Sequence, residues 1–281
     1  MNRIVVIGDA LVDEMRDENG STDAPGGSAL NVAVGLAILG VPSTLIAMIG
    51  NDSAGAHLRA YASDKGVHVL ASPSPLGTGR AVSDRSDGEP RYSFSDAARG
   101  RSIRFSDDMI DAIRDAPLLV ISGFPFDVPA EVAELRRAMA GHPRVLLDPN
   151  PREGFIRDRA SFVTAFEEIA ALCELVKIGD DDAQLLYGLP VGEVMLASSV
   201  VLATSGPGGA TVTTPTDRVH RGIVTDDRPV IDTMGAGDAS FAAVIAGLAS
   251  GSADWGSLLD SAMHIASETI RHAGGELRQP R

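Results

Sequence analysis

The sequence Ile231-Asp232-Thr233-Met234-Gly235-Ala236-Gly237-Asp238-Ala239-Ser240-Phe241 leads from a short apolar pair, Val230-Ile231, into an alanine-rich run that continues to Ala249. We expect the pair to end a strand, the glycines to turn the backbone and the run to form a helix. Free amide groups and a partial positive charge would then meet at the helix N-terminus, where glycine lets an anion approach the backbone. Residues 235–237 are therefore a candidate anion hole for a phosphoryl group.

Asp238 falls in the first turn of this predicted helix. The helix dipole stabilises an acidic residue at this position, so a simple capping role is one explanation. Beside an anion-binding turn, however, a carboxylate would repel the ligand unless it accepts a proton from the group that attacks it. Asp238 is therefore a candidate general base.

The string Asp232-Thr233-Met234-Gly235-Ala236-Gly237-Asp238 resembles the carboxyl-terminal signature of the ribokinase-like, or PfkB-type, sugar kinases. The resemblance implies an α/β fold, with a three-layer α/β/α domain, a mostly parallel central sheet and a small β-sheet lid. It also implies ATP as the phosphoryl donor, with Gly235, Ala236 and Gly237 holding the transferred group and Mg²⁺ bridging the nucleotide phosphates.

Length, composition and charge agree with one large enzyme domain. The chain has 281 residues, of which 44% are hydrophobic, and we expect residues 1–281 to form a single kinase domain. The net charge of −14 argues against nucleic acids and anionic membranes as partners. Cys173 is the only cysteine, which suits a buried thiol in a reducing cytoplasm. The sequence shows neither a signal peptide nor a membrane span, so we expect a cytoplasmic protein.

Apolar strands and helices alternate along the chain, which predicts a parallel sheet covered on both faces. We expect strands at Ile4–Asp9, Ser43–Ile49, Leu118–Ser122, Arg144–Leu147, Leu175–Ile178, Val200–Thr204, Ala210–Thr213 and Val219–Val224, and helices at Ser28–Leu39, Ser53–Lys65, Pro129–Ala140, Ala160–Leu172 and Ser257–Arg271. Asp9, Ser122, Asp148, Lys177 and Thr204 fall at or just beyond strand ends, where such sheets place their active groups. Neither a dinucleotide-binding Gly-x-Gly-x-x-Gly nor a P-loop motif occurs.

Two segments interrupt this alternation. Residues 78–95 alternate apolar and polar positions around Ser86-Asp87-Gly88-Glu89, which is a hairpin signal. Together with residues 10–24 they predict a small projecting sheet, a candidate lid. Because such a sheet has one face to bury, we also predict a homodimer through it.

The segment Gly26-Gly27-Ser28-Ala29-Leu30-Asn31 is similar to the family's amino-terminal Gly-Gly segment. The resemblance implies that the acceptor hydroxyls are bound by Asp9, Asp13, Gly26, Gly27 and Asn31. Carboxylates and amides suit polyol hydroxyls because they accept and donate in fixed directions. An Asn31 amide that caps its own backbone is the alternative. Ser28 stands where a lysine is common in the family, and members acting on phosphorylated sugars need extra cations, so a neutral sugar is favoured.

Two further segments resemble the family's nucleotide site. Thr204-Ser205-Gly206-Pro207-Gly208-Gly209-Ala210 matches the nucleotide-binding turn, and Asp148-Pro149-Asn150-Pro151-Arg152 matches a segment beside the phosphates. The resemblance implies that ATP is contacted by Thr204, Gly206, Gly209, Arg152 and Lys177. A hairpin turn is the alternative for the glycines, and a plain strand end is the alternative for Lys177.

Asp182 and Asp232 are candidate cation ligands. The family usually has Asn or Ser followed three residues later by Glu, where this chain has Gly179-Asp180-Asp181-Asp182. Asp182 is one methylene shorter, which puts the magnesium contact in question, and acidic residues that open a helix need no function. Asp232, with neighbouring carbonyls and residues 273–275, resembles the family's monovalent-cation site and implies K⁺. A capping aspartate is the alternative.

These residues predict ATP-dependent phosphorylation of a primary hydroxyl on a small neutral hexose or ketose. We expect a fructokinase-like enzyme, because Asp87-Gly88-Glu89-Pro90-Arg91-Tyr92-Ser93-Phe94 resembles the hairpin of such kinases. An adenosine-like nucleoside kinase or a ribokinase is the nearest alternative, although few aromatic residues are present to stack a base. A sugar- or nucleotide-sensing protein without catalysis is the alternative from another class, motivated by Gly179 and Asp182.

Overall fold

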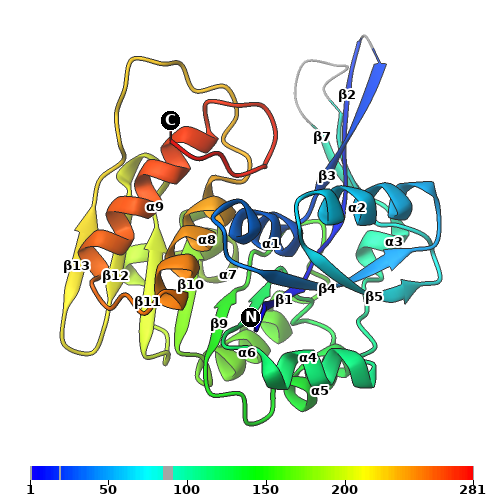
Figure 1. The fold of residues 1–281 in the computed structure, drawn as a ribbon, viewed down its shortest axis with the longest axis horizontal. Helices are drawn as coiled ribbons and strands as arrows, with labels where there is room; N and C mark the ends of the chain where they lie inside the picture. Colours follow the sequence, from blue (N-terminus) through cyan, green and yellow to red (C-terminus); the bar gives the residue numbers. More distant parts are fainter. Residues whose placement is uncertain (1, 19, 85–90, 281) are drawn as a thin grey trace.

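The computed structural model describes residues 2–18, 20–84 and 91–280, in which a nine-stranded sheet runs through the molecule (Figure 1). Its order is β13-β12-β11-β10-β9-β8-β1-β4-β5, parallel except at β12 and β13. The strands are β1 (Ile4–Gly8), β4 (Ser43–Gly50), β5 (His68–Ser74), β8 (Leu119–Ser122), β9 (Val145–Asp148), β10 (Leu175–Gly179), β11 (Val200–Thr204), β12 (Ala210–Thr213) and β13 (Arg218–Arg221).

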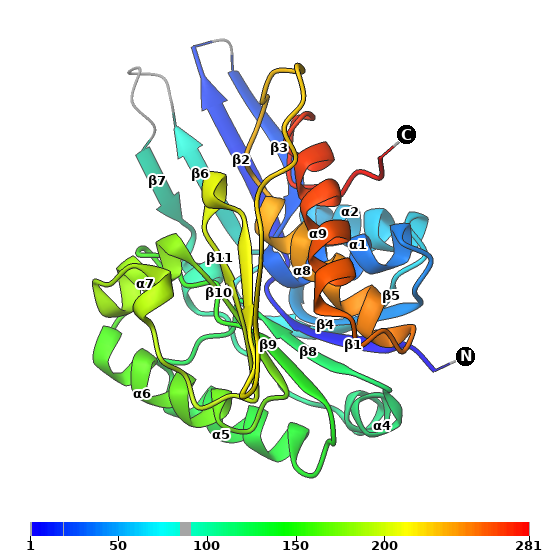
Figure 2. The same cartoon turned by 90° about the vertical axis from the view of Figure 1, so that its left-hand side faces the viewer.

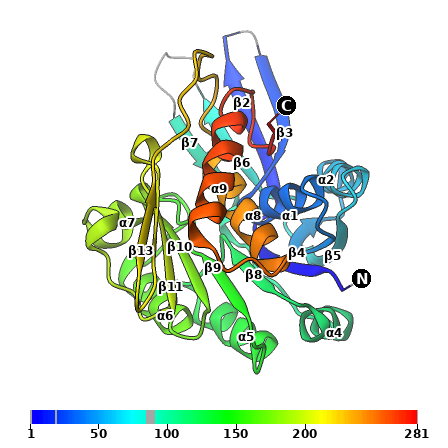
Figure 3. The ribbon, with the colours of Figure 1, turned by 60° about the vertical axis from the view of Figure 1, so that its left-hand side comes forward.

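Helices cover both faces of this sheet, which confirms the expected three layers (Figures 2 and 3). One face carries α1 (Ser28–Ile38), α2 (Ser53–Asp64), α8 (Ala236–Ala249) and α9 (Trp255–Thr269). The other carries α4 (Asp107–Asp115), α5 (Pro129–Met139), α6 (Arg159–Ala170) and α7 (Asp180–Tyr187). Alternate side chains of β1 pack into the hydrophobic cores on the two faces of the sheet. Ile4 and Val6 pack under α1 and α8, whereas Val5 and Ile7 pack under α5 and α6.

A smaller sheet projects beyond the main one, as expected for residues 10–24 and 78–95 (Figure 2). Its order is β3-β2-β6-β7, formed by β2 (Leu11–Asp17), β3 (Gly20–Gly26), β6 (Arg80–Asp84) and β7 (Arg91–Phe94), and the short helix α3 (Asp96–Arg99) follows it. β2 and β6 are parallel and the other pairs are antiparallel. The predicted hairpin tip at Ser86–Glu89 lies outside the described residues, and the role of this sheet as a lid stays a prediction.

The expected strand end at Val230-Ile231 is wrong. Both side chains are exposed and the segment is irregular, tied to the end of α9 where the Ile231 and Asp232 amides donate to the Ile270 carbonyl. Two apolar residues after a proline are too short a run to pair in a sheet. The predicted strand Val219–Val224 is also too long, because β13 ends at Arg221 before Gly222. β5 and α4 were not expected.

The single cysteine is a buried residue of the core. Cys173 is buried, and burial raises the pKa of its thiol to about 12, so it behaves as the small core residue that the sequence predicted. Among the described residues, none of the helices combines the length and apolarity that crossing a membrane requires.

Candidate active site

Polar residues meet where parallel strands end, as the alternation predicted. Gly8 at the end of β1 pairs with Ser122 at the end of β8, and Ser122 pairs with Asp148 at the end of β9. β1 lies between β8 and β4, so chain order reverses direction at β1, and crevices that bind ligands form at such points. Gly8 allows the ends of β1 and β8 to lie close together, because a Cβ atom on residue 8 would lie 1.8 Å from the Ser122 carbonyl oxygen.

Asp238 lies in the first turn of α8 and faces the start of α1. Its Oδ1 accepts a hydrogen bond from Ser28 Oγ at 2.8 Å, and its Oδ2 accepts one from Asn31 Nδ2 at 2.9 Å. The preceding turn depends on Gly235, which has a φ of 75° and whose added Cβ would lie 2.3 Å from the Gly275 carbonyl oxygen. The carboxylate, the glycine turn and the Gly-Gly segment therefore meet at one point.

Ser28 and Ser122 extend this hydrogen-bond chain, which the sequence did not reveal. Ser28 Oγ also hydrogen-bonds Ser122 Oγ. Because Ser28 donates to Asp238, Ser122 is the donor to Ser28. The position of Ser28 beside the Gly-Gly turn was visible in the sequence, but its partner was not.

The surroundings of Asp238 make it a stronger base than a surface aspartate. Burial raises its pKa above the ordinary value, Lys177 opposes this, Asp148 adds to it, and the bonds from Asn31 and Ser28 oppose it. A raised pKa increases the ability of the carboxylate to take a proton from a hydroxyl.

Lys177 lies in the middle of β10 and not at the expected strand end, because the strand continues to Gly179. Its Nζ lies 2.8 Å from Asp148 Oδ2 in a buried ion pair, and a Cβ atom on Gly237 would lie only 3.3 Å from Nζ. The ammonium group is thus beside the glycine turn of α8. Burial alone would lower its pKa, but Asp148, Asp182 and Asp238 raise the pKa overall, so Lys177 stays charged.

Asp182 caps its own helix and lies beside Thr204. Its Oδ2 accepts a hydrogen bond from the Gly179 amide at 2.8 Å, and a Cβ atom on Gly179 would lie 3.4 Å from Thr204 Oγ1. Burial raises the pKa of Asp182 to about 6, while Lys177 opposes the rise. In the described part of the chain, no three His, Cys, Asp or Glu side chains are grouped to hold a metal ion.

The predicted nucleotide turn is a tight hairpin between β11 and β12. The 3-10 turn Gly206–Gly208 follows Ser205, whose amide donates to the Gly209 carbonyl at 2.8 Å. A Cβ atom on Gly209 would lie 2.1 Å from the Arg221 carbonyl oxygen, so packing against β13 requires this glycine. The hairpin alternative accounts for Gly209, and its contact with ATP stays a prediction.

The predicted acceptor residues lie close together around the Gly-Gly segment that precedes α1. Gly27, with a φ of 102°, packs against the Asp9 backbone, and a Cβ atom on Gly26 would lie 2.0 Å from Asp13 Oδ2. Burial raises the pKa of Asp13 to about 6; Asp238 and Asp232 add to the rise and Arg152 opposes it. Asp13 therefore lies within the electrostatic reach of the candidate base.

Asp232 links two loops through backbone amides. Its Oδ1 accepts from Met234 and its Oδ2 accepts from Gly274, each at 3.0 Å. This is the capping arrangement named as the alternative to a cation ligand. The contact with residues 273–275 is as expected, and the monovalent cation stays a prediction.

We expect Asp13→Asn to stabilise the fold by about 1 to 3 kcal/mol at pH 7. A carboxyl with a raised folded-state pKa binds its proton more tightly when folded, so its cost to stability appears as pH rises from 3.8 through about 6. Denaturant unfolding at pH 7 and pH 4 measures this, and the gain should shrink at pH 4. Asp108→Asn, on the exposed face of α4, is the control. An equal gain at both pH values would contradict the assignment.

Comparison with known proteins shows the family of the chain. The family model described as pfkB family carbohydrate kinase matches residues 1–280. A fructokinase of Rhizobium leguminosarum is 29% identical over 273 residues, which cover 87% of this chain and 79% of the relative. A sugar kinase of Pyrococcus horikoshii, solved in complex with ATP, superposes with a TM-score of 0.81 at 23% identity, over 97% of this chain and 93% of the other.

The similarity extends to kinases of another substrate class. The crystal structure of an adenosine kinase from Sinorhizobium meliloti superposes with a TM-score of 0.78 at 19% identity, over 98% of this chain and 95% of that one. This likeness concerns the fold, while the family model covers nearly every residue. The chain belongs to the pfkB family of carbohydrate kinases.

Proposed function

We propose that this sugar kinase transfers the γ-phosphoryl group of ATP to a primary hydroxyl of a small neutral hexose or ketose, as a fructokinase does. One observation carries the proposal: Asp238 is held by Ser28 and Asn31 at the N-terminus of α8, beside the glycine turn and Lys177. An acid side chain, anion-binding amides and a buried cation at one point are the parts that phosphoryl transfer needs.

Each of these groups has one role in the phosphoryl transfer. The acceptor hydroxyl oxygen forms a bond to the γ-phosphorus while the bond to the β,γ-bridging oxygen breaks, and ADP leaves with that electron pair. Asp238 takes the hydroxyl proton. The amides of residues 235–237 and the Lys177 ammonium hold the charge that builds on the phosphoryl oxygens. Because the transition state is loose, the proton transfers late and an ordinary carboxylate suffices.

Mg²⁺ is proposed as the divalent cation beside the nucleotide phosphates, which it neutralises. Asp148 ends β9 and Asp182 lies in the first turn of α7, after the neighbouring strand β10, but Asp148 is engaged by Lys177 and Asp182 caps α7. One or two carboxylates plus substrate phosphates are sufficient for Mg²⁺, so these residues fit as nearby oxygen donors. We also propose K⁺ at Asp232 with the carbonyls of residues 273–275, and contacts to ATP from Thr204, Gly206, Gly209 and Arg152.

The acceptor is tested by measuring ADP release from ATP with fructose, ribose, 2-keto-3-deoxygluconate and adenosine. We expect the highest kcat/KM with fructose and dependence on Mg²⁺. Preference for adenosine would support the nucleoside kinase alternative, which the likeness to adenosine kinase makes the nearest rival. A protein that binds sugar without sugar-dependent ADP release would support the sensing alternative.

We further propose a cytoplasmic homodimer that pairs through the smaller sheet. Within the chain, this sheet carries Glu14, Arg16, Asp23 and Arg80 in ion pairs, so a contact over these side chains would be polar. Salt weakens exposed charge pairs, and the dimer should dissociate as ionic strength rises from 0.05 to about 0.5 M. Sedimentation at both salt concentrations measures this, and a monomer mass at low salt contradicts the proposal.

A further inference from the structure

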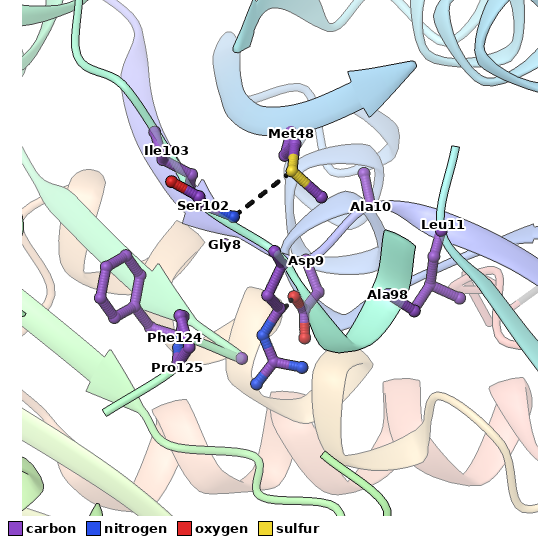
Figure 4. A pocket seen from close by; sticks show the side chains of 13 residues that line it. Gly8, Asp9, Ala10, Leu11, Met48, Ala98, Ser102, Ile103, Phe124 and Pro125 are labelled. Atoms are coloured by element: carbon purple, nitrogen blue, oxygen red, sulfur yellow. Dashed lines mark hydrogen bonds and ion pairs between the residues drawn. The ribbon is translucent and has the colours of Figure 1, made fainter. Parts of the chain in front are cut away.

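We propose that Arg101 and Asp9 form a recognition pair for the acceptor, binding its oxygens at the end remote from the reacting hydroxyl. The inference rests on the proposed sugar kinase activity and adds a specificity-determining residue. The pair lines a pocket at the end of β1, shown in Figure 4. Arg101 was not a predicted site residue, because it lies outside every motif.

Arg101 is partly buried, and two of its buried donor atoms have no hydrogen-bond partner among the described residues. Its side chain is 12% exposed and its guanidinium carbon lies 4.1 Å from the centre of the Phe155 ring. Nε lies 3.3 Å from Asp9 Oδ1, yet neither Nε nor Nη1 has a hydrogen-bond partner among the described residues. A buried donor without a partner costs free energy, so a ligand that supplies an acceptor oxygen is favoured there.

The stacking on Phe155 keeps the guanidinium in place. A planar cation packed on an aromatic ring loses little further freedom when it binds, because the ring already fixes its plane. Asp9 opposite it has an acceptor face, and Gly123 leaves it room: a Cβ atom there would lie 2.8 Å from Asp9 Oδ2. One wall of the pocket thus offers donors and an acceptor side by side.

The start of α1 connects this pair with the reacting site. Asp9 directly follows β1, and Gly27 packs against its backbone, because a Cβ atom on Gly27 would lie 2.5 Å from the Asp9 carbonyl oxygen. Asn31, one helical turn further along α1, donates a hydrogen bond to Asp238. A sugar that lies along the start of α1 with its primary hydroxyl at Asp238 therefore extends its other end toward Asp9 and Arg101.

The lining favours a neutral polyol. Asp9 and Arg101 carry opposite charges, so the pair has little net charge to attract an ion. A sugar hydroxyl donates to Asp9 while its oxygen, or a neighbouring one, accepts from Arg101. The other walls are the apolar side chains of Leu11, Met48, Ala98 and Phe124, which suit the C–H faces of a sugar. Met48 is fixed by the Ser102 amide, which lies 3.3 Å from its sulfur.

The test compares Arg101→Lys and Arg101→Met with Arg104→Met, a matched change at an exposed position of the same segment. We expect KM for fructose to rise about 10- to 100-fold in the Arg101 variants with kcat changed less than about threefold, because a ground-state contact is lost. The sharper readout is 1-deoxyfructose, which lacks the C1 hydroxyl, the one remote from a reacting hydroxyl at C6. Wild-type protein should lose about tenfold in kcat/KM when the C1 hydroxyl is missing, the effect of one lost hydrogen bond, and the Arg101 variants should lose less than about twofold.

Three outcomes would overturn the inference. The first is unchanged KM and unchanged discrimination in variants that merely melt earlier, which would give Arg101 a purely structural role. The second is an equal rise in the KM for fructose in Arg104→Met. The third is a preference for 2-keto-3-deoxygluconate that disappears in Arg101→Met, which would assign the pocket to a carboxylate.

Calorimetric titration with the same sugars separates this inference from the proposed function. If the wild-type protein releases no ADP with any acceptor, the proposed function fails. Fructose affinity then still tests the pair: weaker binding in Arg101→Lys but not in Arg104→Met supports the pair, and equal affinity or no binding in any variant overturns it.

Discussion

Replacing Asp238 with asparagine is expected to lower kcat by about 10²- to 10⁴-fold, the usual worth of a general base, while sugar affinity changes little. The amide keeps the shape of the carboxylate and can keep both contacts: its oxygen accepts from Asn31 Nδ2 and its NH₂ group donates to Ser28 Oγ. What it loses is the capacity to take the hydroxyl proton. The raised pKa of Asp238 adds a second signature, because the contribution of Asp238 to the acidic limb of the wild-type pH profile should lie above pH 3.8 and be absent from the variant.

ADP release at saturating ATP measures this effect, and titration calorimetry with the sugar checks binding. Asp108→Asn is the matched control, because Asp108 also lies in a first helical turn but is exposed. A loss of less than about threefold in Asp238→Asn would assign Asp238 to capping alone, the alternative that the helix dipole offers.

Replacing Lys177 with methionine is expected to lower kcat/KM for ATP by about 10²- to 10³-fold, as the loss of a transition-state charge partner does. It should also cost about 3 to 5 kcal/mol of stability, because Asp148 would stay buried without its partner. The double variant Lys177→Met/Asp148→Asn removes both charges and should regain most of the stability. Activity should stay low, because the cation beside Gly237 is still missing.

Denaturant unfolding and ADP release on the same three proteins separate the two effects. Lys65→Met is the matched control, because Lys65 is the only other lysine in the chain and lies at the end of α2, in a partly exposed ion pair with Glu276. Recovery of full activity in the double variant would contradict the proposed contact with phosphate. It would make Lys177 a structural partner of Asp148.

Much of the fold could be predicted from local patterns. Strands such as Ile4–Gly8 are buried on both faces and appear as continuous apolar runs, and Gly27 marks the start of α1 through a backbone angle that other residues avoid. The same reasoning failed at Val230-Ile231, where an apolar pair lies exposed in a loop. Hydrophobicity over two residues does not identify a strand, because pairing needs a longer run and a neighbour.

The part of the site that lies at strand ends and turns could be predicted from the sequence. Asp9 and Asp148 lie where strands end, Lys177 lies inside the neighbouring strand β10, and their gathering follows from the parallel sheet. Their partners were not predictable. Arg101 and Ser122 lie in no family segment, and nothing local to either shows that one faces Asp9 and the other Ser28.

By itself, the sequence determined the order of most strands and helices, the family signature at Asp232–Asp238 and the edge of the sheet where the candidate site lies, because periodicity and turn residues act over a few neighbours. Only the tertiary structure decided which side chains meet: Asp238 with Ser28, 210 residues apart, Lys177 with the Gly237 turn, and Arg101 with Asp9. Such contacts depend on how helices pack across the sheet, and packing brings together residues whose separation along the chain carries no periodic signal.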